Sequence, residues 1–396
     1  MIHVKGGTVE TGHSKPAINA QGRPRDADDH WSCCGGSGKM MVMMMIGTGR
    51  QEPTLMTVLT RVSRTALAMI TLSLAGALLT GPSQAQNGTA RIISTPVATN
   101  FAKGVSKALN SPQLEISEMN SVPALELMCA AKTATDPIVV LSAMTITPAM
   151  ADQCVANGIS ALTEAQLGFL TLVLVQKSND PPFVLTPRDL YRALANDVPA
   201  DDGFTINTAR NWADVNPKLP ALPIKMILAP RPGVTRSIFE ADAMVVGCRK
   251  YDAIQNIYEA APRVAKCTGM RAETIQEVDD AAERVEALRN AEPGAVALFP
   301  VNIYEENKNW LRVIPFNGFM PTPEDVNRED YTLSAPIYVY THPELIAGDA
   351  INPGVKAWFN EALSESAIGD DGYLNTIGLT VLPKATREWQ RNSLAE

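Results

Sequence analysis

Short apolar runs separated by amphipathic segments recur along the chain from about residue 138 to the C-terminus. Runs of about four to eight apolar residues bounded by turn residues are typical of buried strands. We therefore expect strands at residues 138–141, 170–175, 224–228, 295–299, 311–314, 336–340 and 379–382.

Helix starts are visible between these runs. Thr147, Thr186 and Thr322 each precede a proline, and this pair of residues is typical of an N-cap followed by the first helical position. Gly158 is placed to end the first of these helices. Apolar residues at helical spacing over residues 273–290 predict a solvent-facing amphipathic helix. Strands that alternate with helices indicate an α/β fold.

The most informative stretch is residues 224–240, where a predicted strand leads through a Pro- and Gly-containing turn into a helix. Thr235 is expected to be the N-cap of that helix. The helix N-terminus would then present backbone N–H groups to an anion. Arg236 could add a bidentate donor fork suited to phosphate or carboxylate. The alternative interpretation is an ordinary capped helix with no ligand.

The N-terminal part of the chain has a different character. Residues 1–55 show no sustained period, and we expect them to be a disordered segment upstream of the true translation start at Met56. Arg61 and Arg64, the apolar run at 66–79 and the small residues near Ala85 form the three parts of a secretory signal peptide over residues 56–85. The alternative, a membrane anchor, would need an apolar run of about 20 residues. The mature chain would begin near Gln86 in the periplasm.

Charge then excludes one class of partner. The first 85 residues hold eight of the 34 Lys and Arg and five of the 42 Asp and Glu, so the formal net charge of −8 falls to −11 without them. No basic stripe remains, and nucleic acid is therefore not an expected partner.

Cysteine and histidine usage bound the chemistry. The exported part retains four cysteines, which suggests disulfides in an oxidising compartment. Three connectivities are open, and we prefer Cys129–Cys154 with Cys248–Cys267 because each pair closes a local loop; buried free thiols are the alternative. His342 is the one histidine left, so we expect neither a metal site nor a cofactor, and no enzyme.

Several blocks, in order, resemble the phosphate-binding (PstS-type) substrate-binding proteins of ABC transporters. The resemblance begins at Leu125, includes residues 224–240, and is most specific in the closing blocks YTLSAPIYVYTHPEL and AIGDDGYLNTIGLTVLP. It covers nearly all of the mature chain. It implies the type II periplasmic-binding fold, with two α/β lobes, two hinge crossings and a ligand between the lobes. Paired cysteines at these places are usual in one branch of the family.

The resemblance also implies where a ligand would bind. The family's anion-binding turn falls on the stretch from Arg231 to Arg236, in which Thr235 and Arg236 match the family pattern, while two other positions differ. Its other ligand loops retain only serine and threonine residues. The ligand-binding residues implied are Ser94, Thr95, Ser121, Ser142, Arg231, Gly233, Val234, Thr235 and Arg236.

Departures from the family pattern weaken the ligand assignment more than the fold. Val234 and Pro123 stand where the family has glycines, which let the backbone approach an anion closely. Met144 replaces the residue that would pair with the anion or accept its proton. The expected function is capture of phosphate or a related oxyanion for a transporter. The alternatives are a scaffold that binds another ligand or a protein partner, and a periplasmic phosphate-processing enzyme.

The resemblance completes the expected organisation. Lobe 1 would comprise residues 86–172 and 337–396, and lobe 2 residues 173–336. We expect a periplasmic monomer whose partners are a small anion and an ABC transporter permease.

Overall fold

The computed structural model describes residues 2–3, 90–110, 114–131, 136–201, 203–347 and 352–395. Within residues 1–55 it describes only the strand β1 (Ile2–His3), which pairs with the start of β5 (Ala161–Lys177). The rest of that segment and the predicted signal peptide at 56–85 lie outside the described residues.

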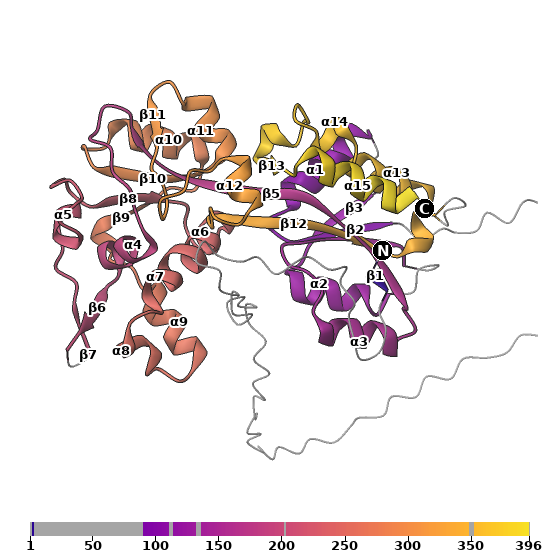
Figure 1. Ribbon diagram of the computed structural model, residues 1–396, viewed down its shortest axis with the longest axis horizontal. Helices are drawn as coiled ribbons and strands as arrows, with labels where there is room; N and C mark the ends of the chain where they lie inside the picture. Colours follow the sequence, from indigo (N-terminus) through magenta and orange to yellow (C-terminus); the bar gives the residue numbers. More distant parts are fainter. Residues whose placement is uncertain are drawn as a thin grey trace, which may run out of the picture. The chain divides into compact units, whose positions relative to one another are not determined.

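One mixed sheet runs through the described part of the chain, in the order β3-β2-β4-β12-β5-β10-β8-β9, with β11 and β13 also paired to β5. β5 and β12 extend from one group of elements to the other (Figure 1). The strands of the sheet not yet given bounds are β2 (Arg91–Ser94), β3 (Glu115–Glu118), β4 (Ile138–Ser142), β8 (Lys225–Leu228), β9 (Ile275–Glu277), β10 (Ala295–Pro300), β11 (Leu311–Val313), β12 (Ser334–Thr341) and β13 (Leu379–Val381).

The register of β5 divides the sheet. Its residues Thr163 to Thr171 pair with β12, and from Leu172 onward it pairs with β10 and β11. β2 is parallel to β3 and β4, and β8 is parallel to β9 and β10, so each part contains a parallel core. Antiparallel neighbours join the two cores. We call the group that contains β2, β3 and β4 the first lobe and the group that contains β8, β9 and β10 the second lobe; the predicted boundaries at residues 172 and 337 remain a prediction.

Helices cover both faces of the first-lobe sheet. Val139 and Leu141 of β4 belong to one apolar core, and Ile138 and Val140 belong to another. A strand buried on both faces is continuously apolar, which is why β4 was readable from the sequence. The helices are α1 (Thr99–Ala108), α2 (Ser121–Met128), α3 (Pro148–Ala156), α13 (Pro353–Ala362), α14 (Glu365–Ile368) and α15 (Lys384–Ala395), with the 3-10 turns η4 (Pro343–Leu345) and η5 (Asn375–Ile377).

The second lobe adds a hairpin and several short helices. The hairpin is formed by β6 (Asp197–Ala200) and β7 (Gly203–Ile206). α6 (Val234–Phe239), the π-helical η2 (Glu240–Val245) and α7 (Val246–Cys248) follow one another without a break. The other helical elements are α4 (Pro187–Leu194), α5 (Trp212–Val215), α8 (Asp252–Gln255), α9 (Ala260–Thr268), the 3-10 turn η3 (Ala272–Thr274), α10 (Ala281–Asn290), α11 (Val301–Asn307) and α12 (Pro323–Asn327).

The helix-start predictions are confirmed at three places. Thr147, Thr186 and Thr322 are N-caps whose side chains accept a backbone hydrogen bond, with proline following each. Gly158 follows the end of α3 with a φ of 85°, a conformation that favours glycine.

The helix predicted over residues 273–290 is wrong in its first half. Ala272–Thr274 is a 3-10 turn and Ile275–Glu277 is strand β9, which pairs in parallel with β8. Asp280 then caps α10 by accepting from the Glu283 N–H at 2.9 Å. The apolar spacing fitted one helix because the strand supplies an apolar residue at a helical interval. Pairing with β8 decides the structure.

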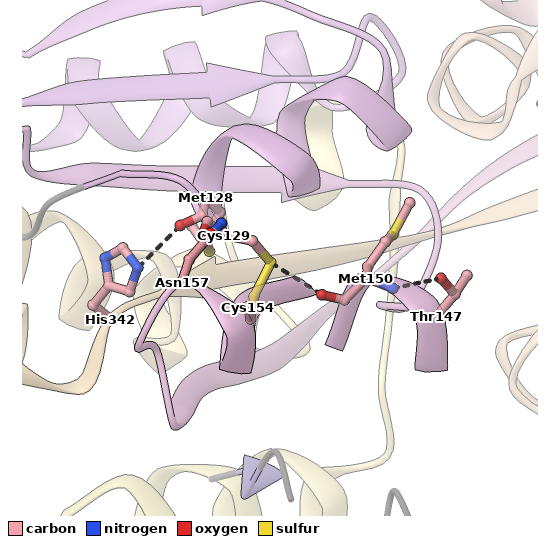
Figure 2. The surroundings of a disulfide bond; sticks show 7 residues. All are labelled: Met128, Cys129, Thr147, Met150, Cys154, Asn157 and His342. Atoms are coloured by element: carbon pink, nitrogen blue, oxygen red, sulfur yellow. Dashed lines mark hydrogen bonds between the residues drawn. A yellow bond between two sulfur atoms is a disulfide. The ribbon is translucent and has the colours of Figure 1, made fainter. Parts of the chain in front are cut away.

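Two disulfides join Cys129 to Cys154 and Cys248 to Cys267. This confirms the preferred pairing among the three that were open. The first links the end of α2 to α3, and Figure 2 shows His342 beside Met128 at the same end of α2. The second links the end of α7 to α9.

Candidate functional site

Three strands of the first lobe end side by side. β2, β3 and β4 are parallel and in register, so their carboxyl ends lie at one edge of the sheet. The loops that follow are hydrogen-bonded to one another. The Met119 N–H donates to the Ser94 carbonyl at 3.0 Å, and the Thr95 N–H donates to the Leu141 carbonyl at 3.0 Å. The carboxyl edge of such a sheet is where α/β proteins commonly bind ligands.

Four predicted ligand-binding hydroxyls lie at this edge, and two are committed to their own loops. Ser94 Oγ donates to the Thr95 carbonyl at 3.1 Å. Ser142 Oγ donates to the Met144 carbonyl at 2.7 Å and accepts from the Met144 N–H at 3.1 Å. These two serines therefore shape the loops.

The other two hydroxyls retain hydrogen-bonding capacity. Ser121, the first residue of α2, accepts from the Ala143 N–H at 3.2 Å, which leaves its own proton for another acceptor. Thr95 is 2% exposed, and its Oγ1 has no hydrogen-bond partner in the part of the chain that the structure describes. A buried hydroxyl without a partner is costly and calls for an explanation.

An apolar rim lies beside these hydroxyls. Met119, Val122, Met144 and Ile146 are partly buried and pack against the core cluster beneath α2 and α3. Met144 therefore contributes packing where the resembling family has a charged group. The sequence already indicated this loss, and the structure shows what replaces the charge.

A carboxylate that the sequence analysis did not single out lies behind the loop that follows β4. Tyr340 Oη donates to Glu164 and accepts from the Ile146 N–H at 3.3 Å. Burial raises the pKa of Glu164, and the hydrogen bond from Tyr340 opposes that shift. Burial, with the charge of Glu164 next, raises the pKa of Tyr338 to about 12. The sequence feature that could have indicated this buried carboxylate is a glutamate, Glu164, within a largely apolar strand.

The predicted anion turn of the second lobe follows β8. The Arg231–Pro232 peptide bond is cis, and the Gly233 N–H donates to the Pro230 carbonyl at 3.0 Å. Gly233, with extended backbone angles, is the N-cap of α6, so the prediction of Thr235 as N-cap is wrong. Thr235 already lies in the first helical turn, where its backbone is helical. Val234, Thr235 and Arg236 are the first three helical residues, and their N–H groups find no acceptor within the helix.

Arg236 is buried within protein contacts. It is 4% exposed, and its Nε donates to Glu240 Oε1 at 2.5 Å. One terminal nitrogen donates to Glu277 Oε1 at 3.1 Å and to the Ala229 carbonyl at 3.4 Å, and the other contacts Met270 Sδ at 3.6 Å. The guanidinium fork expected to meet an anion thus meets two carboxylates of the protein.

Arg231 joins the same network. Its Nε donates to Glu240 Oε1 at 2.6 Å, and its terminal nitrogen donates to the Thr268 carbonyl at 2.8 Å. We call Arg231, Arg236, Glu240 and Glu277 the four-residue ion cluster. The i, i+4 spacing of Arg236 and Glu240 was visible in the sequence as an ion-pair signal. Glu277 was not, because its approach depends on the pairing of β8 with β9.

Both parallel cores run toward the same crossing. Ser142, the last residue of β4, pairs with Tyr338 of β12, whereas Val139 pairs with a residue closer to the end of β12. β4 therefore runs toward the start of β12. Pro300, the last residue of β10, pairs with Leu172 of β5. The preceding residue of β5, Thr171, pairs with the first residue of β12. The strand ends that carry the predicted ligand loops therefore point toward the crossing from both lobes.

The described residues carry neither a membrane-spanning helix nor a group of metal ligands. No helix there combines the length and the apolar character needed to span a membrane. No three of their His, Cys, Asp or Glu side chains are grouped so that they could hold a metal ion.

The sequence matches no protein-family model and no curated protein. Solved structures do match. A possible phosphate binding protein from Planctomyces limnophilus shares 20% identity over 78% of this chain and 98% of its own, with a TM-score of 0.56. PstS from Borrelia burgdorferi shares 15% identity over 75% of this chain and 100% of its own, with a TM-score of 0.49. An ABC-type phosphate transport receptor from Vibrio cholerae shares 16% identity over 74% of this chain and 99% of its own, with a TM-score of 0.47.

The likeness to the Planctomyces structure confirms the fold. The chain has the predicted type II periplasmic-binding fold, with two α/β lobes joined through β5 and β12. At this identity the likeness establishes the fold and leaves the ligand to the chemistry of the site.

Proposed function

We propose that the protein is a solute-binding protein that captures phosphate or a related small oxyanion. The observation that carries the proposal is Thr95, whose buried Oγ1 has no partner among the described residues and which lies where three strand-end loops meet. An oxyanion would supply the missing acceptor. The description of the Planctomyces structure as a possible phosphate binding protein supports the same ligand class.

The described residues offer neutral donors for such a ligand. The hydroxyls of Thr95 and Ser121 would donate from the first lobe, and Ser94 and Ser142 would hold the loops that present them. From the second lobe, the N–H groups of Val234 and Thr235 have no helical acceptor. Binding would require no covalent chemistry. Closure of the lobes about β5 and β12 would bring the two donor sets together.

The cellular role follows from the same proposal. A protein of this kind would work outside the cytoplasm, where disulfides such as Cys129–Cys154 and Cys248–Cys267 persist. It would act as a monomer and deliver its ligand to an ABC transporter permease. The signal peptide proposed at residues 56–85 would direct its export.

One observation favours a second candidate. Met144 contributes no charge, and Arg236 is paired with Glu240 and Glu277. A scaffold of this fold that binds a different ligand or a protein partner would also show these features. Measured binding of oxyanions separates the two functions.

Calorimetric titration with phosphate, sulfate and molybdate tests the proposal. Thr95→Val should weaken phosphate binding about ten- to a hundredfold, because a hydrogen bond to a charged acceptor is worth roughly 1.5–3 kcal/mol. Thr163→Val is the matched control, because Thr163 Oγ1 is also buried without a partner in the described residues but belongs to β5. Equal affinity in the Thr95→Val and Thr163→Val variants would place the ligand elsewhere. Absence of binding by the parent protein to all three anions would favour the scaffold.

A further inference from the structure

Glu277 lies next to the predicted anion turn because of strand pairing. It is the last residue of β9 and pairs with Leu228, the last residue of β8. The Val278 N–H also donates to the Leu228 carbonyl at 2.9 Å, which holds the two strand ends together. The Glu277 carboxylate reaches Arg236: its Oε1 lies 3.1 Å from Nη1 of the guanidinium.

The two carboxylates around Arg236 differ in exposure. Glu240 is 15% exposed and contacts both Arg231 and Arg236, so it links the turn to the helix. Glu277 is 49% exposed, and within the described residues its ion pair is with Arg236. Of the two carboxylates, Glu277 can leave Arg236 at the smaller cost in free energy, because its half-exposed carboxylate can be solvated by water.

Charge balance gives this difference a consequence. The four-residue ion cluster contains two arginines and two glutamates, so it offers no net positive charge to an anion at the start of α6. An oxyanion that approached the Arg236 terminal nitrogen held by Glu277 would meet that carboxylate. Two anions cannot share that donor without repulsion.

We propose that Glu277 is an internal competitor for the ligand: it occupies one terminal nitrogen of Arg236, and an oxyanion must displace it to bind that nitrogen of the second lobe. This inference rests on the proposed function and names the residue that sets its affinity and selectivity. An anion that accepts several hydrogen bonds at once can replace the carboxylate. An anion that accepts fewer is excluded.

Glu277→Gln tests the competitor directly. The amide keeps the size of the side chain and removes the charge, so phosphate should bind about tenfold more tightly, and sulfate should gain at least as much. Glu273→Gln is the matched control. Glu273 lies on the neighbouring turn η3, is 70% exposed and has its carboxylate 3.7 Å from the Arg271 guanidinium. Its substitution therefore removes the same charge without affecting the contact with Arg236.

The outcomes separate this inference from the proposed function. Parent protein that binds phosphate, with unchanged affinity in Glu277→Gln, would overturn the competitor and leave the proposed function intact. An equal gain in Glu273→Gln would also overturn it, because net charge alone would then account for the gain. Binding by Glu277→Gln but not by the parent would support the competitor and refute phosphate capture by the native protein. If neither binds, both ideas fail.

A second variant guards against misfolding. Glu277→Asp keeps the charge on a shorter side chain, so its gain in affinity should fall between those of the parent and Glu277→Gln. A melting temperature equal to that of the parent would show that each variant is folded. An aspartate variant that binds phosphate as tightly as the glutamine variant would contradict competition by charge.

Discussion

Gln390 of α15 pairs with both backbone groups of Gln166 in β5. Its Oε1 accepts from the Gln166 N–H at 2.6 Å, and its Nε2 donates to the Gln166 carbonyl at 3.2 Å. The side-chain amide thus takes the place of a neighbouring strand at a residue whose flanks are paired to β1 and β13.

Gln390→Met should therefore destabilise the protein by about 1–3 kcal/mol, because it leaves a backbone N–H and carbonyl without partners. Gln390→Glu should also destabilise the protein, because its second carboxylate oxygen would face the Gln166 carbonyl and its charge would be buried. Urea denaturation measures both. Equal stability of the methionine variant and the parent would show that water replaces the amide without cost.

Gly247 lies where α7 crosses α4. A Cβ at this position would overlap the carbonyl of Pro187, which belongs to backbone and cannot rotate away. Gly247→Ala should cost roughly 1–3 kcal/mol through overpacking. Gly269→Ala is a suitable control, because the nearest atom to its Cβ would be a side-chain nitrogen of Asn196 at 3.2 Å. A thermal melt in which both variants match the parent would contradict the tight crossing.

His342 predicts a loss of stability in acid. It is 1% exposed, its Nε2 lies 3.2 Å from the Met128 carbonyl, and its Nδ1 has no partner in the described residues (Figure 2). Burial lowers the pKa of His342 below its ordinary value of 6.5. The unfolded chain therefore binds this proton first, so unfolding becomes easier as pH falls below about 6.5.

His342→Gln removes this titration while keeping a side-chain N–H that can reach the carbonyl. Its free energy of unfolding should change less between pH 7 and pH 5 than that of the parent. Glu164 acts in the opposite direction, because burial raises its pKa and its neutral form is favoured as pH falls toward its ordinary value of 4.5. Parallel pH profiles for the variant and the parent would show that His342 is not the group responsible.

Removal of the Cys248–Cys267 disulfide should destabilise the second lobe. The bridge spans 19 residues of sequence, and loop closure of that length is worth roughly 3 kcal/mol in the chain-entropy model. The double alanine variant should show this loss in guanidinium denaturation. Reduction of the parent cannot replace this variant, because both bridges are buried and a reductant does not distinguish them by exposure.

Local signals in the sequence were sufficient for much of the fold. The threonine caps at residues 147, 186 and 322 depend on neighbouring residues alone, and each was readable. The first half of β5 was missed because Glu164, Gln166 and Gly168 interrupt its apolar pattern. Gly168 has a φ of 155° opposite the register shift in β12, a feature of pairing between distant segments.

The candidate site shows the same limit. The serine and threonine positions could be named from the resemblance, but their hydrogen bonds could not. Only the fold shows that Ser94 and Ser142 are committed to their loops, whereas the Thr95 hydroxyl has no partner among the described residues. The Arg236–Glu277 contact needed the register of β8 and β9, which no local pattern encodes.

The position of β12 between β4 and β5 also affects how the protein is made. A nascent chain that has not yet reached Ser334 lacks the strand that pairs with both β4 and β5. Unpaired apolar strands favour pairing with other chains. Synthesis must therefore be nearly complete before the first-lobe sheet can close, so products truncated ahead of β12 should aggregate.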